Sequence, residues 1–150
     1  GFQIATVIER CLDLSRGSLV EHGIEVTLDC QLSNEMANGH PLQIEKPLIA
    51  LLNNAREAVL EGAPSNPKIT IVATAVEADI AKIVVSDNGC GFTEDLRDRV
   101  FEPFFSTRTA DKNVGLGLSV AQAVLNDLGG RLNLDSDNGW TTATMVVPLR

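Results

Sequence analysis

Hydrophobic residues recur at helical spacing in three segments of the chain. The first segment, residues 2–23, carries apolar side chains at mostly three- and four-residue intervals and ends at a glycine. The second begins near Pro47, continues through LIALLNNAREAVLEG and ends at Gly62. The third, VGLGLSVAQAVLNDLGG (114–130), starts with two glycines and is closed by two more. We therefore predict three long helices.

Five other segments alternate apolar and polar residues, or run apolar between turn signals, as strands do. They are IEVTLDCQL (24–32), KITIVATAV (68–76), DIAKIVVSD (79–87), RLNLDSD (131–137) and TTATMVVPL (141–149). Residues 93–100 could add one short helix. Helices separated from adjacent strand pairs predict an α+β fold. We expect a two-layer sandwich in which about three helices cover one face of a mixed sheet of about five strands, with residues 1–150 forming a single domain.

Composition narrows the classes of function. A chain of 150 residues with 44% hydrophobic residues can bury roughly two-thirds of its unfolded surface. The net charge of −8 argues against a non-specific nucleic-acid binder, which needs a cationic face. The three cysteines are odd in number and far apart, so we expect buried or incidental thiols in a reducing compartment. There is no apolar run long enough to cross a membrane.

Aromatic residues are concentrated in one segment, DNGCGFTEDLRDRVFEPFFSTR (87–108). Four of the five phenylalanines lie there, namely Phe92, Phe101, Phe104 and Phe105. Four of the twelve basic residues also lie in or just after it. The segment 102–113 has no clear period, so it reads as a loop, and the nearby basic residues could meet a small anionic ligand.

Within the second predicted helix, the stretch LLNNAREA carries polar residues among the apolar ones. Asn53 lies away from the apolar stripe and is expected to face solvent, whereas Asn54 lies at its edge. An amide there could ligate a hard cation or hydrogen-bond a phosphate. The alternative is a polar border residue at a helix–sheet seam, which is common.

Two glycine patterns follow later in the chain. Asp87 ends a strand and precedes Gly89 and Gly91, so a ligand could lie against bare backbone while the carboxylate accepts from an exocyclic amine. The alternative is a hairpin turn, but no second alternating strand follows. Gly115 and Gly117 open a helix, where free N–H groups favour an anion, although G-x-G alone is a weak signal.

Taken together and in this order, the motifs resemble the ATP-binding catalytic domain of two-component sensor histidine kinases. LLNNAREA resembles the family's N box, DNGCGF its first glycine box, FEPFFSTR its F box and VGLGLSVAQAV its second glycine box. The closing strands, 129–149, are also similar. The resemblance covers nearly the whole chain and is least specific before residue 42. It implies the Bergerat-type ATPase fold shared with gyrase, the Hsp90 chaperones and MutL.

The resemblance assigns roles at the adenine end of a site for ATP. Asp87 would accept from the adenine amine, and Gly89 and Gly91 would give the base room. Ala58 would form part of a wall of small residues. Thr142, on a closing strand, would reach the adenine site directly or through water.

At the phosphate end, the family implies that Asn54 ligates Mg²⁺ bridging the ATP phosphates. Thr107 and Arg108 match the end of a mobile ATP lid and would approach the phosphates. Backbone donors would come from Gly115, Leu116, Gly117 and Leu118. Within the lid, we expect Phe101, Phe104 and Phe105 to anchor the near end to the core, with Pro103 stiffening the bend. The alternative is that these aromatics are ordinary core residues.

Several positions depart from the family pattern. Many members carry an acid or amide one helical turn before the N-box asparagine, where this chain has Ala50. Glu57 is a candidate substitute, and Arg108 a second candidate catalytic group. Asn113 and Val114 replace the usual G-T, and Ala143 replaces an aromatic. The departures leave the ATP-binding elements intact and bear on Mg²⁺ coordination and phosphotransfer.

The resemblance also implies partners. Neither His22 nor His40 lies in a phosphoacceptor helix, which would precede Gly1, so the chain looks like part of a longer protein and should not phosphorylate itself. We expect a monomeric fragment of a homodimeric, cytoplasmic kinase region that signals to a response regulator, without nucleic-acid or membrane contact. The alternative is a degenerate kinase that binds a nucleotide or a partner. An ATP-hydrolysing clamp is a third reading, which the F box and the absence of a glutamate at position 50 disfavour.

Overall fold

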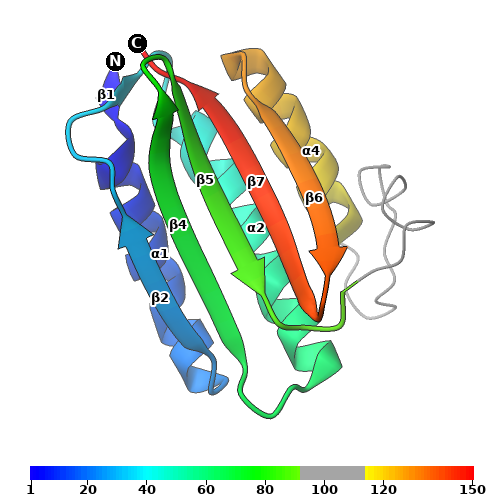
Figure 1. The fold of residues 1–150 in the computed structure, drawn as a ribbon. Coiled ribbons are helices and arrows are strands. Elements are labelled where there is room, and N and C mark those ends of the chain that lie inside the picture. Colours follow the sequence, from blue (N-terminus) through cyan, green and yellow to red (C-terminus); the bar gives the residue numbers. More distant parts are fainter. Residues whose placement is uncertain (92–113) are drawn as a thin grey trace.

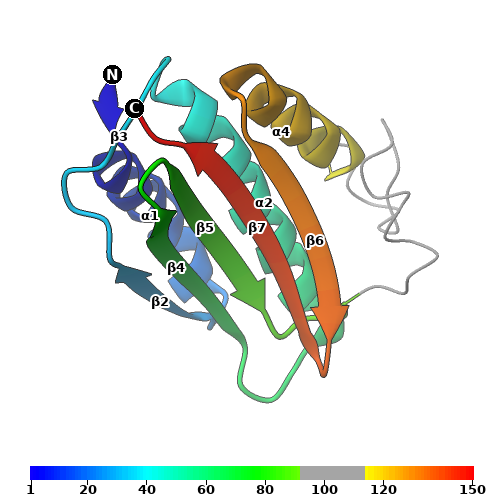
Figure 2. The ribbon, with the colours of Figure 1, turned by 45° about the horizontal axis from the view of Figure 1, so that its top comes forward.

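The computed structural model describes residues 1–91 and 114–150, and side chains in the second range from Leu118 onward. Three helices lie side by side against one face of a sheet (Figures 1 and 2). The helices are α1 (Ile4–Glu21), α2 (Leu42–Gly62) and α4 (Val114–Leu128). The strands are β1 (Phe2–Gln3), β2 (Glu25–Cys30), β3 (Met36–Ala37), β4 (Lys68–Glu77), β5 (Ile80–Asp87), β6 (Arg131–Asp137) and β7 (Trp140–Pro148).

The main sheet has five strands in the order β2-β4-β5-β7-β6. The β2–β4 pair is parallel, and every other neighbouring pair is antiparallel. A parallel pair needs a crossover connection, and α2 supplies it between β2 and β4. The helix α4 likewise connects β5 to β6, with β7 inserted between them in the sheet. The predicted α+β sandwich, with its mixed five-stranded sheet and three helices on one face, is confirmed.

The core lies between the sheet and the helix layer. Strand residues alternate, so every second side chain of β5, of β7 and of β4 as far as Ala73 faces the helices and is buried. The helix α2 contacts both α1 and α4 and occupies the middle of the helix layer (Figure 1). Its buried stripe agrees with the helical periodicity in the sequence and comprises Ile44, Pro47, Leu48, Leu51, Leu52, Ala55, Ala58 and Val59.

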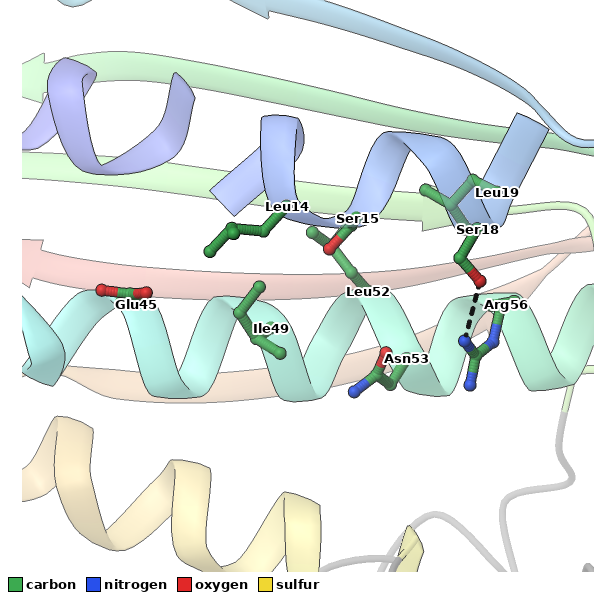
Figure 3. A pocket seen from close by; sticks show the side chains of 9 residues that line it. All are labelled: Leu14, Ser15, Ser18, Leu19, Glu45, Ile49, Leu52, Asn53 and Arg56. Carbon is green, nitrogen blue, oxygen red and sulfur yellow. Dashed lines mark hydrogen bonds between the residues drawn. The ribbon is translucent and has the colours of Figure 1, made fainter. Parts of the chain in front are cut away.

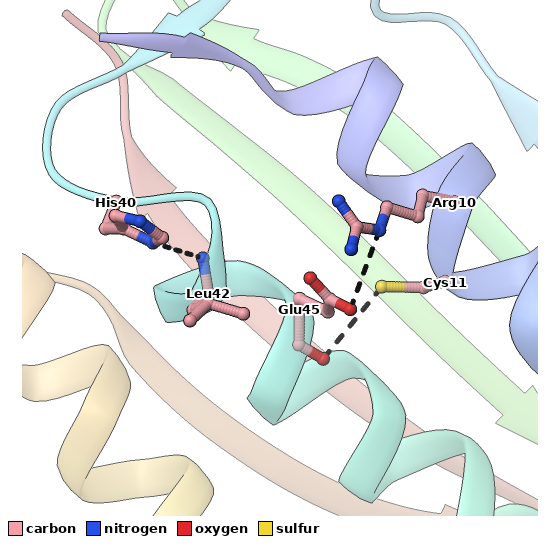
Figure 4. A network of polar contacts seen from close by, with 5 residues as sticks. All are labelled: Arg10, Cys11, His40, Leu42 and Glu45. Atoms are coloured by element: carbon pink, nitrogen blue, oxygen red, sulfur yellow. Dashed lines mark hydrogen bonds and ion pairs between the residues drawn. The ribbon is translucent and has the colours of Figure 1, made fainter.

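The helix α2 begins at Leu42, five residues before the predicted start near Pro47. The prediction relied on the preference of proline for the first helical turn. The structure instead has a local cap in the preceding residues. The side chain of Gln43 accepts from the His40 N–H (2.9 Å), and His40 Nδ1 accepts from the Leu42 N–H (3.1 Å; Figure 4). These contacts satisfy N–H groups that a helix start leaves open.

Both histidines therefore have structural positions at helix ends. His22 follows α1, and its Nδ1 is 2.7 Å from the carbonyl oxygen of Ser18, to which a protonated Nδ1 donates. His40 is exposed and caps α2. These positions agree with the expectation that neither histidine is catalytic.

A small second sheet, which the sequence did not predict, joins the ends of the chain. β1 pairs antiparallel with β3, and two residues per strand are too few to show a period. The Arg150 N–H donates to the Met36 carbonyl (2.7 Å), and the Leu149 N–H donates to that of Asp79 (2.7 Å). Both termini thus lie at one end of the sheet, and Asp87 at the end of β5 lies at the other (Figure 1). No helix within the described ranges is long and apolar enough to cross a membrane.

Candidate functional site

Asp87 is the last residue of β5 and is only 3% exposed. It continues the row of helix-facing residues Ala81, Ile83 and Val85, so its carboxylate lies at the end of the apolar core. Its Oδ1 accepts from the N–H of Gly89 at 2.9 Å. This bond fixes the orientation of the carboxylate relative to the turn that follows. A buried carboxylate of this kind needs donors, and a charged hydrogen bond contributes about 1.5–3 kcal/mol.

The turn after Asp87 lies directly on the backbone of α2. The Cys90 N–H donates to the Ala58 carbonyl at 3.0 Å. A Cβ added to Gly89 would come within 2.6 Å of the Val59 nitrogen and closer still to the Ala58 carbonyl group. A Cβ on Gly62 would lie 2.6 Å from the Cys90 nitrogen. Glycine is therefore required for this close approach of two backbones.

Gly91 has a left-handed backbone, with φ of +67°. A Cβ at this position would lie 2.8 Å from the hydroxyl of Ser136 and 3.7 Å from that of Thr141. The turn is thus packed between α2 on one side and the β6–β7 hairpin on the other. We call Asp87, Gly89, Gly91 and the adjoining backbone at Ala58 the cradle, in which backbone rather than side chains lies beside a buried carboxylate that could accept from an amine-bearing base.

The predicted polar residues of α2 lie at the seam next to this turn. Asn53 is exposed and Asn54 is half-buried, as the helical pattern predicts. Asn54, Ala58 and Gly62 recur every four residues, so they share one face of α2. Ala58 and Gly62 contact the turn, and Asn54 lies one helical turn further along, where it could meet a ligand that extends from the cradle. Glu57 is half-buried on the same helix.

The structure corrects the assignment on β7. Thr142 pairs with Ser86, and their hydroxyls are 3.5 Å apart on the face of the sheet that the helices do not cover. Thr141 pairs with Asp87, is 6% exposed and lies on the helix-facing side. Thr141 is therefore the threonine beside the carboxylate. The signal was present in the sequence, because Thr141 alternates with the inward-facing Ala143 and Met145.

The second glycine pattern lies inside α4. Gly115, Leu116 and Gly117 belong to its first turn, where backbone N–H groups lack partners within the helix. Leu118 follows, and its side chain is 4% exposed within the core cluster, as expected for an anchor.

Several predicted features lie outside the described residues. These are the short helix at 93–100, the basic residues after the glycine turn, and Phe92, Phe101, Pro103, Phe104, Phe105, Thr107, Arg108 and Asn113. Within residues 1–91 and 114–150, no group of three or more histidine, cysteine, aspartate or glutamate side chains could hold a metal ion.

A hollow of about 400 Å³ lies between α1 and α2 (Figure 3). Arg56 crosses it and donates to the Ser18 hydroxyl at 3.2 Å. The residues that line it are Leu14, Ser15, Ser18, Leu19, Glu45, Ile49, Leu52, Asn53 and Arg56. It contains neither Asp87 nor Asn54, so it is separate from the candidate site.

The cysteines differ more than expected. Cys11 is buried and Cys30 is half-buried. The Cys11 thiol donates to the Glu45 carbonyl at 3.9 Å, beside the Arg10–Glu45 ion pair at 3.8 Å (Figure 4). Burial, followed by the charge of Glu45, raises the pKa of Cys11 from 9.0 to about 12. Cys90, in the glycine turn, is exposed rather than buried.

Known proteins share this arrangement. A family model described as histidine kinase-, DNA gyrase B- and HSP90-like ATPase matches residues 39–150. The chain is 32% identical over 151 residues to the two-component sensor PprA of Pseudomonas aeruginosa, covering 99% of this chain and 16% of that protein. It is 31% identical over 136 residues to the C4-dicarboxylate transport sensor protein DctB of Rhizobium meliloti, covering 91% of this chain and 21% of that protein.

Solved structures agree in fold. The mycobacterial sensor histidine kinase MprB aligns with a TM-score of 0.82 at 23% identity, covering 99% of this chain and 96% of that one. The catalytic domain of the histidine kinase ThkA aligns with a TM-score of 0.84 at 24% identity, covering 98% of this chain and 93% of that one.

The buried aspartate before a glycine turn and the sheet covered by helices agree with the class that the family model gives, a nucleotide-binding ATPase. The chain belongs to the histidine kinase-, DNA gyrase B- and HSP90-like ATPase family, as a catalytic domain of the histidine kinase type. Membership of this family implies ATP binding. The chain spans 16% and 21% of the length of the two curated sensors named above.

Proposed function

We propose that this domain binds Mg²⁺-ATP and donates the γ-phosphoryl group to a histidine on a dimerisation helix that lies outside the described chain. The observation that carries the proposal is the buried Asp87 carboxylate, held by Gly89 in front of a turn seated on α2. Family membership supplies ATP as the ligand. The adenine amine would donate to Asp87, between the wall at Ala58 and the backbone of Gly89 and Gly91.

The phosphates would extend from this cradle toward the polar seam of α2 and the start of α4. Asn54 would ligate Mg²⁺ together with phosphate oxygens, since the described residues form no metal cluster of their own. The first turn of α4, with Gly115, Leu116 and Gly117, would donate backbone N–H groups, and Leu118 would anchor it. Thr107 and Arg108 would approach the phosphates by the resemblance alone. When bound, Mg²⁺ neutralises charge that develops during phosphoryl transfer.

The proposed reaction breaks the bond between the β- and γ-phosphates and forms a bond from phosphorus to an imidazole nitrogen, with ADP leaving. The protein's part is to position ATP and stabilise its charge. The acceptor helices would come from the same homodimeric kinase, and a response regulator would receive the group next. ThkA was crystallised in complex with the response regulator TrrA, which supports this kind of partner. The odd number of widely spaced cysteines and the use of ATP favour a cytoplasmic location.

We expect Asp87→Asn to weaken ATP binding by at least about tenfold, near 1.4 kcal/mol, because the acceptor of the adenine amine is lost. Calorimetric titration with a non-hydrolysable ATP analogue would measure this, with Asp79→Asn in the turn after β4 as the matched control. An affinity unchanged in Asp87→Asn would refute the adenine assignment.

A second candidate function is a nucleotide-binding module with little phosphotransfer. The observation that favours it is Ala50, a half-buried methyl group one turn before Asn54 that can neither ligate a cation nor act as a base. Incubating the domain with labelled ATP and a separately produced acceptor helix should yield phosphohistidine if the domain is a kinase. ATP binding without any phosphohistidine, while a competent kinase domain labels the same helix, would support the module instead.

A further inference from the structure

Three neighbouring strands change from apolar to polar at the same level of the sheet. On the helix-facing side, β5 runs through Val85 to Asp87, and β7 reaches Thr141 after Ala143. β6 presents Leu132 and Leu134, both buried, and then the half-buried Ser136. Asp87 pairs with Thr141, and Thr141 pairs with Ser136. The three side chains therefore form one polar row across β5, β7 and β6.

The outer member of this row, Ser136, contacts the other components of the site. Its hydroxyl is 3.5 Å from that of Thr141, at the long limit for a hydrogen bond. The same oxygen would lie 2.8 Å from a Cβ on Gly91. Ser136 is thus packed against both the buried threonine and the left-handed glycine.

Ser136 can affect the recognition of a base held by Asp87 without touching that base. Neighbouring strands are about 4.8 Å apart, so Ser136 lies two strands, or roughly 10 Å, from Asp87. Its influence must pass through Thr141 and Gly91. We propose that Ser136 is a positioning residue for purine recognition, which orients the Thr141 hydroxyl and supports the glycine turn in front of Asp87. This inference rests on the proposed binding of ATP.

The matched control is on the opposite face of the same sheet. Ser86 and Thr142 form a second hydroxyl pair, also at 3.5 Å, next to Asp87 and Thr141 in sequence. The two pairs share residue types and distance, but one joins β5 to β7 and the other joins β6 to β7, on opposite faces of the sheet. Ser86→Ala therefore reports the loss of a hydroxyl pair away from the site.

The test is calorimetric titration of the whole chain with ATP and with inosine triphosphate, which lacks the exocyclic amine. Loss of one neutral hydrogen-bonding group should weaken ATP binding by about fivefold in Ser136→Ala. The preference for ATP over inosine triphosphate should fall as well, because Ser136 acts on the recognition of the amine. In a Thr141→Val background, Ser136→Ala should add little. Ser86→Ala should bind both nucleotides as the wild type does.

Several results would overturn the inference. Equal weakening toward both nucleotides, full additivity with Thr141→Val, or wild-type affinity in Ser136→Ala would each do so. If Ser136→Ala does not fold, Ser136→Cys keeps the shape without the hydroxyl and is subject to the same criteria. If the wild type binds ATP, and this binding is lost in Asp87→Asn but unchanged in Ser136→Ala, the inference fails while the proposed function stands. A wild-type chain that binds no ATP removes the proposed function and the inference together.

Discussion

Gly89 shows how a single missing side chain places the site. Its Cα lies so close to α2 that a methyl group would collide with the backbone at Ala58 and Val59. The backbone of a helix cannot yield as a flexible side chain can. The carboxylate of Asp87, which accepts from the Gly89 N–H, depends on the same placement. One residue therefore couples the packing of the turn to the orientation of the acceptor.

We expect Gly89→Ala to lower the free energy of unfolding by at least about 1 kcal/mol and to weaken ATP binding, because the turn must move away from α2. Gly17→Ala is the matched control. Gly17 lies inside α1 with nothing within 4 Å of an added Cβ. That change should stabilise the protein by roughly 0.5–1 kcal/mol and leave ATP binding unaltered. Urea unfolding and calorimetry would measure both, and a Gly89→Ala protein with wild-type stability and affinity would contradict the packing argument.

At the scale of elements, the sequence predicted the long periodic segments well. Each of the three helices and five main strands was found, since their period reports one buried face. The two-residue strands β1 and β3 have no period to detect. The start of α2 was missed because the cap depends on the side chains of His40 and Gln43, whereas Pro47 is a stronger local signal.

The candidate site was predictable to the extent that it is local. Asp87, Gly89 and Gly91 lie within five consecutive positions, and their residue types indicate an acceptor next to a close backbone approach. Thr141 and Ser136 join the site only through the pairing of β5, β7 and β6, which one sequence does not reveal. The assignment of Thr142 to the adenine site was one position away from Thr141, and successive side chains of a strand lie on opposite faces of the sheet.

The contact between α1 and α2 predicts a pH dependence of stability. The folded pKa of Cys11 is raised, mainly by burial, from 9.0 to about 12, so the folded state retains the thiol proton more tightly than the unfolded state. This contribution is complete below about pH 9 and is lost as the pH rises toward 12. Urea unfolding between about pH 8 and pH 11 should show the stability of the wild type falling more steeply than that of Cys11→Ala. Parallel curves would contradict the burial of this thiol.

At the scale of the whole molecule, ATP should act as a stabilising ligand. A ligand that binds only the folded state at about 100 times its Kd adds about 2.7 kcal/mol to the free energy of unfolding. Thermal unfolding with Mg²⁺-ATP should therefore show a raised Tm in the wild type and a much smaller shift in Asp87→Asn. Chelation of Mg²⁺ should reduce the shift, because Asn54 alone cannot neutralise the phosphates. An equal shift in both proteins would indicate binding elsewhere.

The two chain ends meet beside the β1–β3 pair, while Asp87 lies at the far end of β5, whose eight residues span about 26 Å. Adjacent ends make the domain a candidate for circular permutation, in which a short peptide joins them and new ends open at another turn. A host protein could also accept the domain within one of its own surface loops with little stretching. In either architecture the linker would stay remote from the purine cradle, so attached neighbours could change without altering nucleotide recognition.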